Sequence, residues 1–96
     1  MTVRSLLSQK ALHVESGVTL SSAGREDMAL ELGGHVLMIA VDRGQHRMRF
    51  TLPAAPRWDD TGEALPPEVA GELRAIITEI AVFWEQQPEF EVVEPG

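Results

Sequence analysis

Cysteine and tyrosine are both absent from this 96-residue chain, and lysine occurs only once. Without cysteine the protein has no disulfide, no thiolate metal ligand and no thiol nucleophile. No stretch approaches the roughly 20 apolar residues of a membrane span, and residues 1–10 lack the apolar segment of a signal peptide. These absences predict a cytoplasmic protein without a membrane partner, stabilised by the packing of its core.

What remains is the composition of a small globular domain. Hydrophobic residues make up 44% of the chain and charged residues 24%, which is far from the composition of disordered proteins. A chain of this length buries roughly 60–65% of its unfolded surface around one core. We therefore predict a single domain over residues 1–96 that folds without a cofactor.

The negative charge is concentrated in the C-terminal part of the chain. The formal net charge is −7, yet the residues up to Trp58 include seven basic and five acidic side chains. From Asp59 onward a single basic residue, Arg74, stands among ten acidic ones. Such a block repels nucleic acid and attracts a basic protein surface, although a solubilising surface has the same composition.

One long helix is predicted over residues 66–86. Pro66 and Pro67 suit the first helical turn, and Glu68 complements the positive end of the helix dipole. The apolar residues of this segment recur at helical spacing and form one stripe. The stripe consists of Val69, Leu73, Ile76, Ile77, Ile80, Phe83 and Trp84. Such an apolar stripe is buried in a folded protein, so we expect the helix to pack against a sheet.

The preceding residues supply that sheet. Alternating or apolar segments predict strands over residues 10–15, 18–20, 28–32, 35–41 and 46–52, with residues 1–9 as a loose or edge segment. The unbroken apolar run at 36–41 predicts a central strand covered on both faces, and residues 42–45 predict a hairpin connection in which Gly44 takes the positive φ. A short strand at 90–93 returns to an edge. The predicted fold is α+β in two layers: an antiparallel sheet of four to five strands, one long C-terminal helix and this terminal strand.

Catalytic and metal sites are not indicated by the sequence. His13, His35 and His46 lie on different predicted strands, and no acidic residue stands at metal-ligand spacing from His35 or His46. The serines lack a nucleophile-elbow motif and a histidine positioned beside them. We therefore predict a protein that is not an enzyme, with its histidines at the surface or at strand ends.

A nucleic-acid site is also not predicted. Arg43, Arg47 and Arg49 form a basic stripe, but stacking aromatic residues are missing from it, and Phe50 points to the other face of its strand. A solvated face, or ion pairs with Glu31, explains the stripe.

Acidic side chains flank the predicted helix stripe. Three glutamates at steps of four and seven residues line one side of the helix, and three acidic residues of the preceding loop extend this surface. The candidate partner-binding residues are Asp59, Asp60, Glu63, Glu68, Glu72 and Glu79. The alternative is an ordinary polar outer face. Trp58, in the same loop, is predicted to close the end of the core rather than to anchor a partner.

The C-terminal half resembles a family of small bacterial immunity proteins, immunity protein 74, from polymorphic-toxin systems. The matching residues are Trp58, Asp59, Pro67, Ile76, Ile77, Ile80, Phe90, Glu91 and Val92. The resemblance implies a cytoplasmic, non-enzymatic protein that binds and neutralises a cognate toxin domain, often a basic nuclease. Two alternatives remain: a self-associating module that pairs through Val82 or through an edge strand at 10–14, and a small-molecule binding domain with a pocket between helix and sheet.

Overall fold

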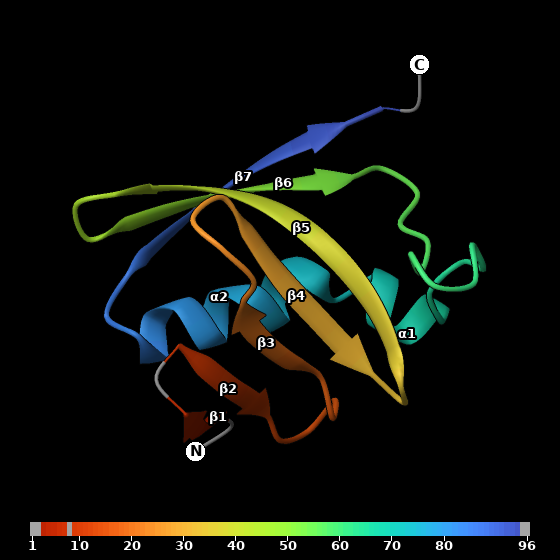
Figure 1. Ribbon diagram of the computed structural model, residues 1–96, viewed down its shortest axis with the longest axis horizontal. Helices are drawn as coiled ribbons and strands as arrows, with labels where there is room; N and C mark the ends of the chain where they lie inside the picture. Colours follow the sequence, from red (N-terminus) through yellow and green to blue (C-terminus); the bar gives the residue numbers. More distant parts are fainter. Residues whose placement is uncertain (1–2, 8, 95–96) are drawn as a thin grey trace.

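The computed structural model describes residues 3–7 and 9–94. Across these residues seven strands form one sheet in sequential order, antiparallel except for the last pair, β6 and β7, which run parallel (Figure 1). The strands are β1 (Val3–Leu7), β2 (Lys10–His13), β3 (Thr19–Ser22), β4 (Asp27–Leu32), β5 (His35–Gly44), β6 (Arg47–Pro53) and β7 (Gln87–Val93). The α+β class is confirmed, but the predicted count of four to five strands was too low.

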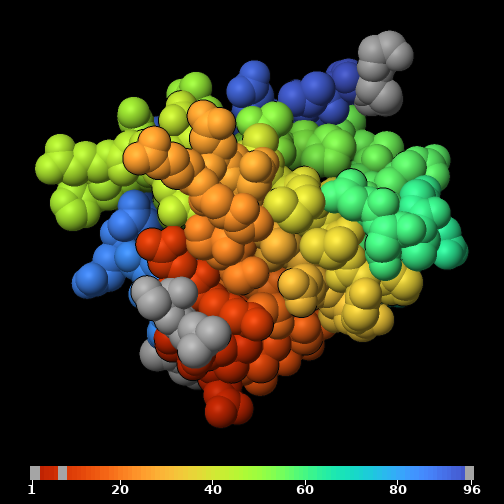
Figure 2. All heavy atoms as spheres, viewed as in Figure 1, coloured from red at the N-terminus to blue at the C-terminus, as the bar shows by residue number. Residues whose placement is uncertain are grey.

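A helical layer covers one face of this sheet. A single turn, α1 (Pro67–Ala70), precedes the 11-residue helix α2 (Leu73–Phe83), which contacts β1, β2 and β7. The sheet curves around α2 in Figure 1, and in Figure 2 the strands hide this helix from the viewer. In the part of the chain that the structure describes, neither helix has the length and hydropathy needed to cross a membrane.

The core lies between the concave face of the sheet and the helix stripe. Met48, Phe50 and Leu52 of β6 point inward as predicted, and Phe50 is fully buried. Ile77 and Ile80 of α2 are also fully buried. Each such side chain contributes about 1.5–3 kcal/mol by its removal from water, so this contact holds the two layers together.

The predicted single helix is interrupted at Gly71 and Glu72. The Glu72 N–H donates to the Val69 carbonyl at 3.1 Å, one residue closer in sequence than an α-helical bond. A Cβ on Gly71 would lie 3.2 Å from the Pro67 carbonyl oxygen, so glycine permits this tight turn. The helical segment thus divides into α1 and α2.

The C-terminus of α2 also comes earlier than predicted. Two backbone bonds of 2.9 Å close it: Glu85 N–H to the Val82 carbonyl and Gln86 N–H to the Ala81 carbonyl. This is a Schellman motif in which Glu85, at φ 60°, occupies the left-handed position that usually holds glycine. The chain turns there, and β7 begins at Gln87.

The β5–β6 hairpin is longer and tighter than the sequence suggested. The predicted connection at residues 42–45 would pair Val41 with His46, but Val41 pairs with Phe50. The connection is the two-residue turn Gln45–His46, and the positive φ of 61° belongs to His46 instead of Gly44. The predicted register is therefore wrong by four residues. Because four is an even number, the faces of the strands are unchanged.

The outer face of β5 is open, contrary to the prediction that both faces are covered. Leu37, Ile39 and Val41 are buried, whereas Met38 is 42% exposed and Ala40 also lies in solvent. The terminal strand predicted at 90–93 does form an edge, as part of β7. The predicted edge segment at 1–9 contains β1; Met1, Thr2 and Ser8 lie outside the described residues.

Candidate functional site

Three of the six predicted acidic residues line one groove. Glu68, Glu72 and Glu79 surround a hollow of about 400 Å³ between the helices and the turn that follows β2. We call this hollow the acidic groove. The other residues that line it are His13, Glu15, Ser16, Val69, Ala75 and Ile76. Four carboxylates therefore gather around a partly apolar floor.

The other predicted acidic residues belong to the loop between β6 and α1. The Asp59 carboxylate accepts the Met38 N–H at 2.6 Å, and the Asp60 carboxylate lies 3.0 Å from His35 Nδ1. The hydrogen bond with His35 is the main reason that the pKa of Asp60 falls below its usual value. The backbone carbonyl of Glu63 accepts the Trp58 N–H at 2.8 Å. This loop is thus fastened to β5 and to itself.

Trp58 fills the end of the core, as predicted. Its side chain is 5% exposed and belongs to the main hydrophobic cluster. The ring also stacks on His35 with 5.6 Å between centroids. The loop is therefore anchored by apolar burial as well as by hydrogen bonds.

His13 is the last residue of β2, in agreement with the predicted strand-end position, but its side chain is buried. It is 4% exposed, and with Ala11 it occupies the inward face of β2, while Val14 is 47% exposed. The turn after β2 holds it in place: the His13 N–H donates to the Val18 carbonyl at 2.8 Å, and the Gly17 N–H donates to the His13 carbonyl at 2.9 Å. Gly17 adopts a φ of 78°, which suits glycine in this turn.

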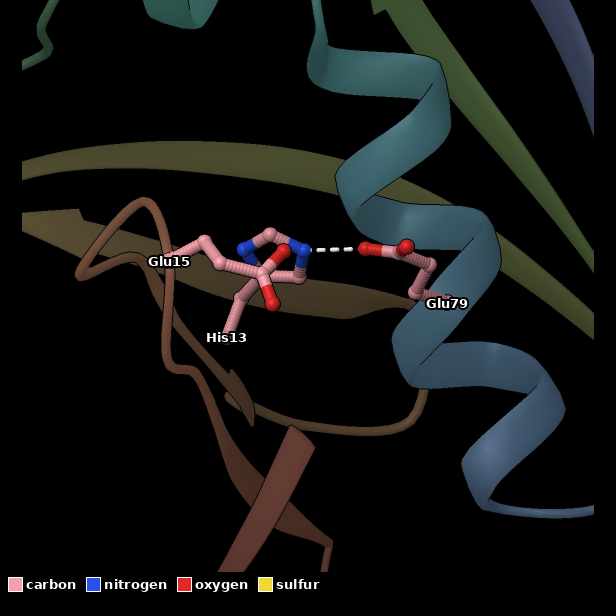
Figure 3. Close-up of side chains that lie close together, drawn as sticks. All are labelled: His13, Glu15 and Glu79. Carbon is pink, nitrogen blue, oxygen red and sulfur yellow. Dashed lines mark hydrogen bonds and ion pairs between the residues drawn. The ribbon is translucent and has the colours of Figure 1, made fainter. Parts of the chain in front are cut away.

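Both ring nitrogens of His13 have polar partners. Nδ1 lies 2.8 Å from Ser16 Oγ and 3.3 Å from the Ser16 N–H, and Nε2 contacts the Glu79 carboxylate (Figure 3). Because a backbone N–H can only donate, this network assigns Nδ1 as an acceptor and places the ring hydrogen on Nε2, facing Glu79. The contact joins β2 to α2 across the two layers.

The order Ser16, His13, Glu79 has the residue types of a hydrolase triad, although the sequence showed no histidine beside a serine. Catalysis by this serine would also require backbone N–H groups for an oxyanion. The three neighbouring N–H groups are engaged: Ser16 with His13 Nδ1, Gly17 with the His13 carbonyl, and Val18 with Ser16 Oγ at 3.1 Å. The turn uses Ser16 as a structural hydroxyl.

Glu15 completes a cluster of three candidate metal ligands. One nitrogen or oxygen atom from each of His13, Glu15 and Glu79 lies within 4.8 Å of the others. In Figure 3 these side chains converge from β2, from the following turn and from α2. Sequence spacing missed the cluster because Glu79 is 66 residues away from His13.

The basic stripe is paired with β7 rather than with Glu31. Arg47 and Arg49 lie 3.6 and 3.3 Å from the Glu89 carboxylate. Arg43 belongs to a second hollow of about 430 Å³, where its guanidinium contacts Ser22 and Met28. The arginines of β5 and β6 thus have intramolecular partners.

Comparisons with known proteins found no match: no family model, no curated protein and no solved structure is similar to this chain.

Proposed function

We propose that this protein is a cytoplasmic, non-enzymatic immunity protein that binds and neutralises a cognate toxin domain through the acidic groove. The observation that carries the proposal is the gathering of Glu15, Glu68, Glu72 and Glu79 around one hollow. Among the described residues that line it there is no lysine or arginine. A basic toxin, such as a nuclease domain, has the complementary charge.

The groove combines the two features of a protein-binding site. Ala75 is exposed in the groove beside the buried side chains of Val69 and Ile76, and a partner side chain would cover this small apolar area. The surrounding glutamates would steer a basic surface toward it, which raises the association rate and fixes the orientation of the complex. Arg74, the basic residue of the acidic half, lies 5.8 Å from the Phe90 ring centroid, at β7.

Asp59, Asp60 and Glu63 remain part of the proposed surface, with a different contribution. Asp59 and Asp60 already accept hydrogen bonds from β5 or contact its histidine. They would add to the negative field that attracts the toxin rather than form its central contacts.

The first experiment identifies the partner and tests protection. The tagged protein is purified from its native host, and the C-terminal domain of a co-purifying secreted protein is then expressed in a test strain with and without this chain. The proposal expects a stoichiometric complex and restored growth. Absence of protection, with expression of both proteins verified, would contradict it.

Charge reversal then tests the groove. Glu68→Lys with Glu72→Lys should lower the association rate for the toxin by about tenfold or more and weaken its dependence on salt, because steering is lost. Glu91→Lys with Glu94→Lys makes the same change in net charge on exposed residues of β7 and its end. Equal losses from both pairs would show that net charge, and not the groove, governs binding.

Self-association is the second candidate, and exposed apolar residues favour it. Val82 is 60% exposed, and Val92 and Val93 on the edge strand β7 are 42% and 48% exposed. The predicted edge at 10–14 was wrong, because β2 pairs with both β1 and β3. Sedimentation velocity of the protein alone distinguishes a dimer, for which the edge strand β7 offers a pairing surface, from a monomer that awaits its partner.

A further inference from the structure

We propose that His13, Glu15 and Glu79 bind a divalent transition-metal ion of the zinc type at the wall of the acidic groove. The proposal goes beyond partner binding and can be tested without any partner. It rests on a buried imidazole and two carboxylates that meet from separate segments of the chain.

The distances suit a site that closes by small side-chain movements. The three candidate ligand atoms lie within 4.8 Å of one another. With metal bonds of about 2.0–2.2 Å to nitrogen and oxygen, the ion would replace the direct contact between His13 Nε2 and the Glu79 carboxylate, and the Glu15 carboxylate would turn toward it. Glu15 is exposed on its turn and can rotate, whereas β2 fixes the buried ring of His13.

Metal binding would require the other tautomer of His13, and Ser16 supplies an acceptor for it on the far side of the imidazole. Ser16 Oγ lies 2.8 Å from Nδ1. When Nε2 binds a metal, the neutral ring carries its hydrogen on Nδ1, and this hydroxyl oxygen accepts it. No proton is gained or lost by the ring in that exchange of tautomers.

A structural histidine–glutamate pair would not require Glu15. A second carboxylate beside Glu79 concentrates negative charge at one point of the groove wall, and this charge attracts a cation. One imidazole with two carboxylates suits zinc, manganese or iron better than calcium, which prefers a shell of oxygen ligands. The groove leaves the remaining coordination positions open to water.

The test is calorimetric titration of the chelator-treated, full-length protein with zinc, with cobalt as a spectroscopic probe. The proposal expects one zinc per chain and visible cobalt bands of a low-coordinate site. Glu15→Gln and Glu79→Gln should each weaken zinc binding by about tenfold or more, since each removes a charged ligand without a change in size. Glu68→Gln and Glu72→Gln, in the same groove but outside the ligand set, should change it less than about threefold.

Two results would overturn the proposal: the absence of saturable binding, or equal weakening in all four glutamine variants, which would indicate diffuse attraction to the groove. Glu15 lies on an exposed turn, so the Glu15→Gln variant keeps the fold. This variant tests the site even if Glu79→Gln weakens the contact between α2 and the sheet. If zinc does not bind, the proposal of toxin binding still stands. If the toxin does not bind, the zinc titration can still support the metal site.

Discussion

The residues that the structure describes contain two histidine–carboxylate pairs, and these pairs differ in their surroundings. In the first pair the side chain of His13 is 5% exposed and that of Glu79 44%. In the second, the side chains of His35 and Asp60 are 43% and 37% exposed. Water screens the second pair but reaches the first from one side only, so the same chemistry has a larger effect on stability between the two layers than on the loop.

The loop has another source of stability. Trp58 lies directly beside His35 and buries nearly all of its surface, so apolar packing holds this region and the polar pair only orients it. At His13 the polar pair contributes more to holding the structure together, because this contact itself bridges β2 and α2. Three measurements can sharpen or break this contrast.

The largest effect is expected from Trp58→Ala. Truncation of a buried aromatic residue leaves a cavity and should lower the free energy of unfolding by about 3–5 kcal/mol. Urea denaturation followed by circular dichroism measures this change, with His35→Ala as the neighbouring control. A loss from His35→Ala as large as that from Trp58→Ala would mean that the polar pair, and not the tryptophan, holds the loop.

A smaller effect is expected from the His13–Glu79 contact. Glu79→Gln should destabilise the protein by about 1 kcal/mol, and His13→Ala by about 1–3 kcal/mol, because it also opens a gap in the buried face of β2. A double-mutant cycle in chelator-containing buffer should give a coupling energy of about 0.5–1.5 kcal/mol. The same cycle at His35 and Asp60 should give a smaller coupling energy, because both of these side chains are in contact with water. Equal coupling in both cycles would break the comparison.

The smallest effect is expected from acid titration of Asp60. Its pKa is lowered in the folded state, chiefly by the hydrogen bond with His35, so its stabilising contribution is complete above the unfolded-state pKa and is lost as the pH falls through the folded-state pKa. This places the loss below about pH 4. Carboxyl-detected NMR should show the pKa of Asp60 moving upward in His35→Ala. No movement would assign the lowered pKa to the backbone instead.

The predictable part of the fold follows from periodicity. The helix stripe and the inward face of β6 were identified because apolar residues recur at the period of each element. The face of β2 was not identifiable in this way. Leu12 and Val14 are more hydrophobic than Ala11 and His13, yet the second pair points inward, because a small residue and a bonded histidine fit beneath α2.

Element boundaries depended on contacts that a local pattern does not contain. Glu85 ends α2 in the left-handed conformation although glycine is the usual signal, and Gly71 interrupts a helix that its neighbours favour. The metal-ligand cluster was missed for a related reason. No sequence pattern near His13 predicts its contact with Glu79, because only the packing of α2 over β2 brings the two residues together.

The position of α2 in the chain has a consequence for synthesis. The first six strands form a meander whose neighbours are close in sequence, so they can pair while the ribosome is still adding residues. Leu20, Leu30 and Ile39 then present an apolar surface that stays uncovered until α2 emerges and packs on it. During this interval the apolar face of the nascent sheet can associate with other chains. The packing of α2 on the sheet covers this face and ends the risk of aggregation.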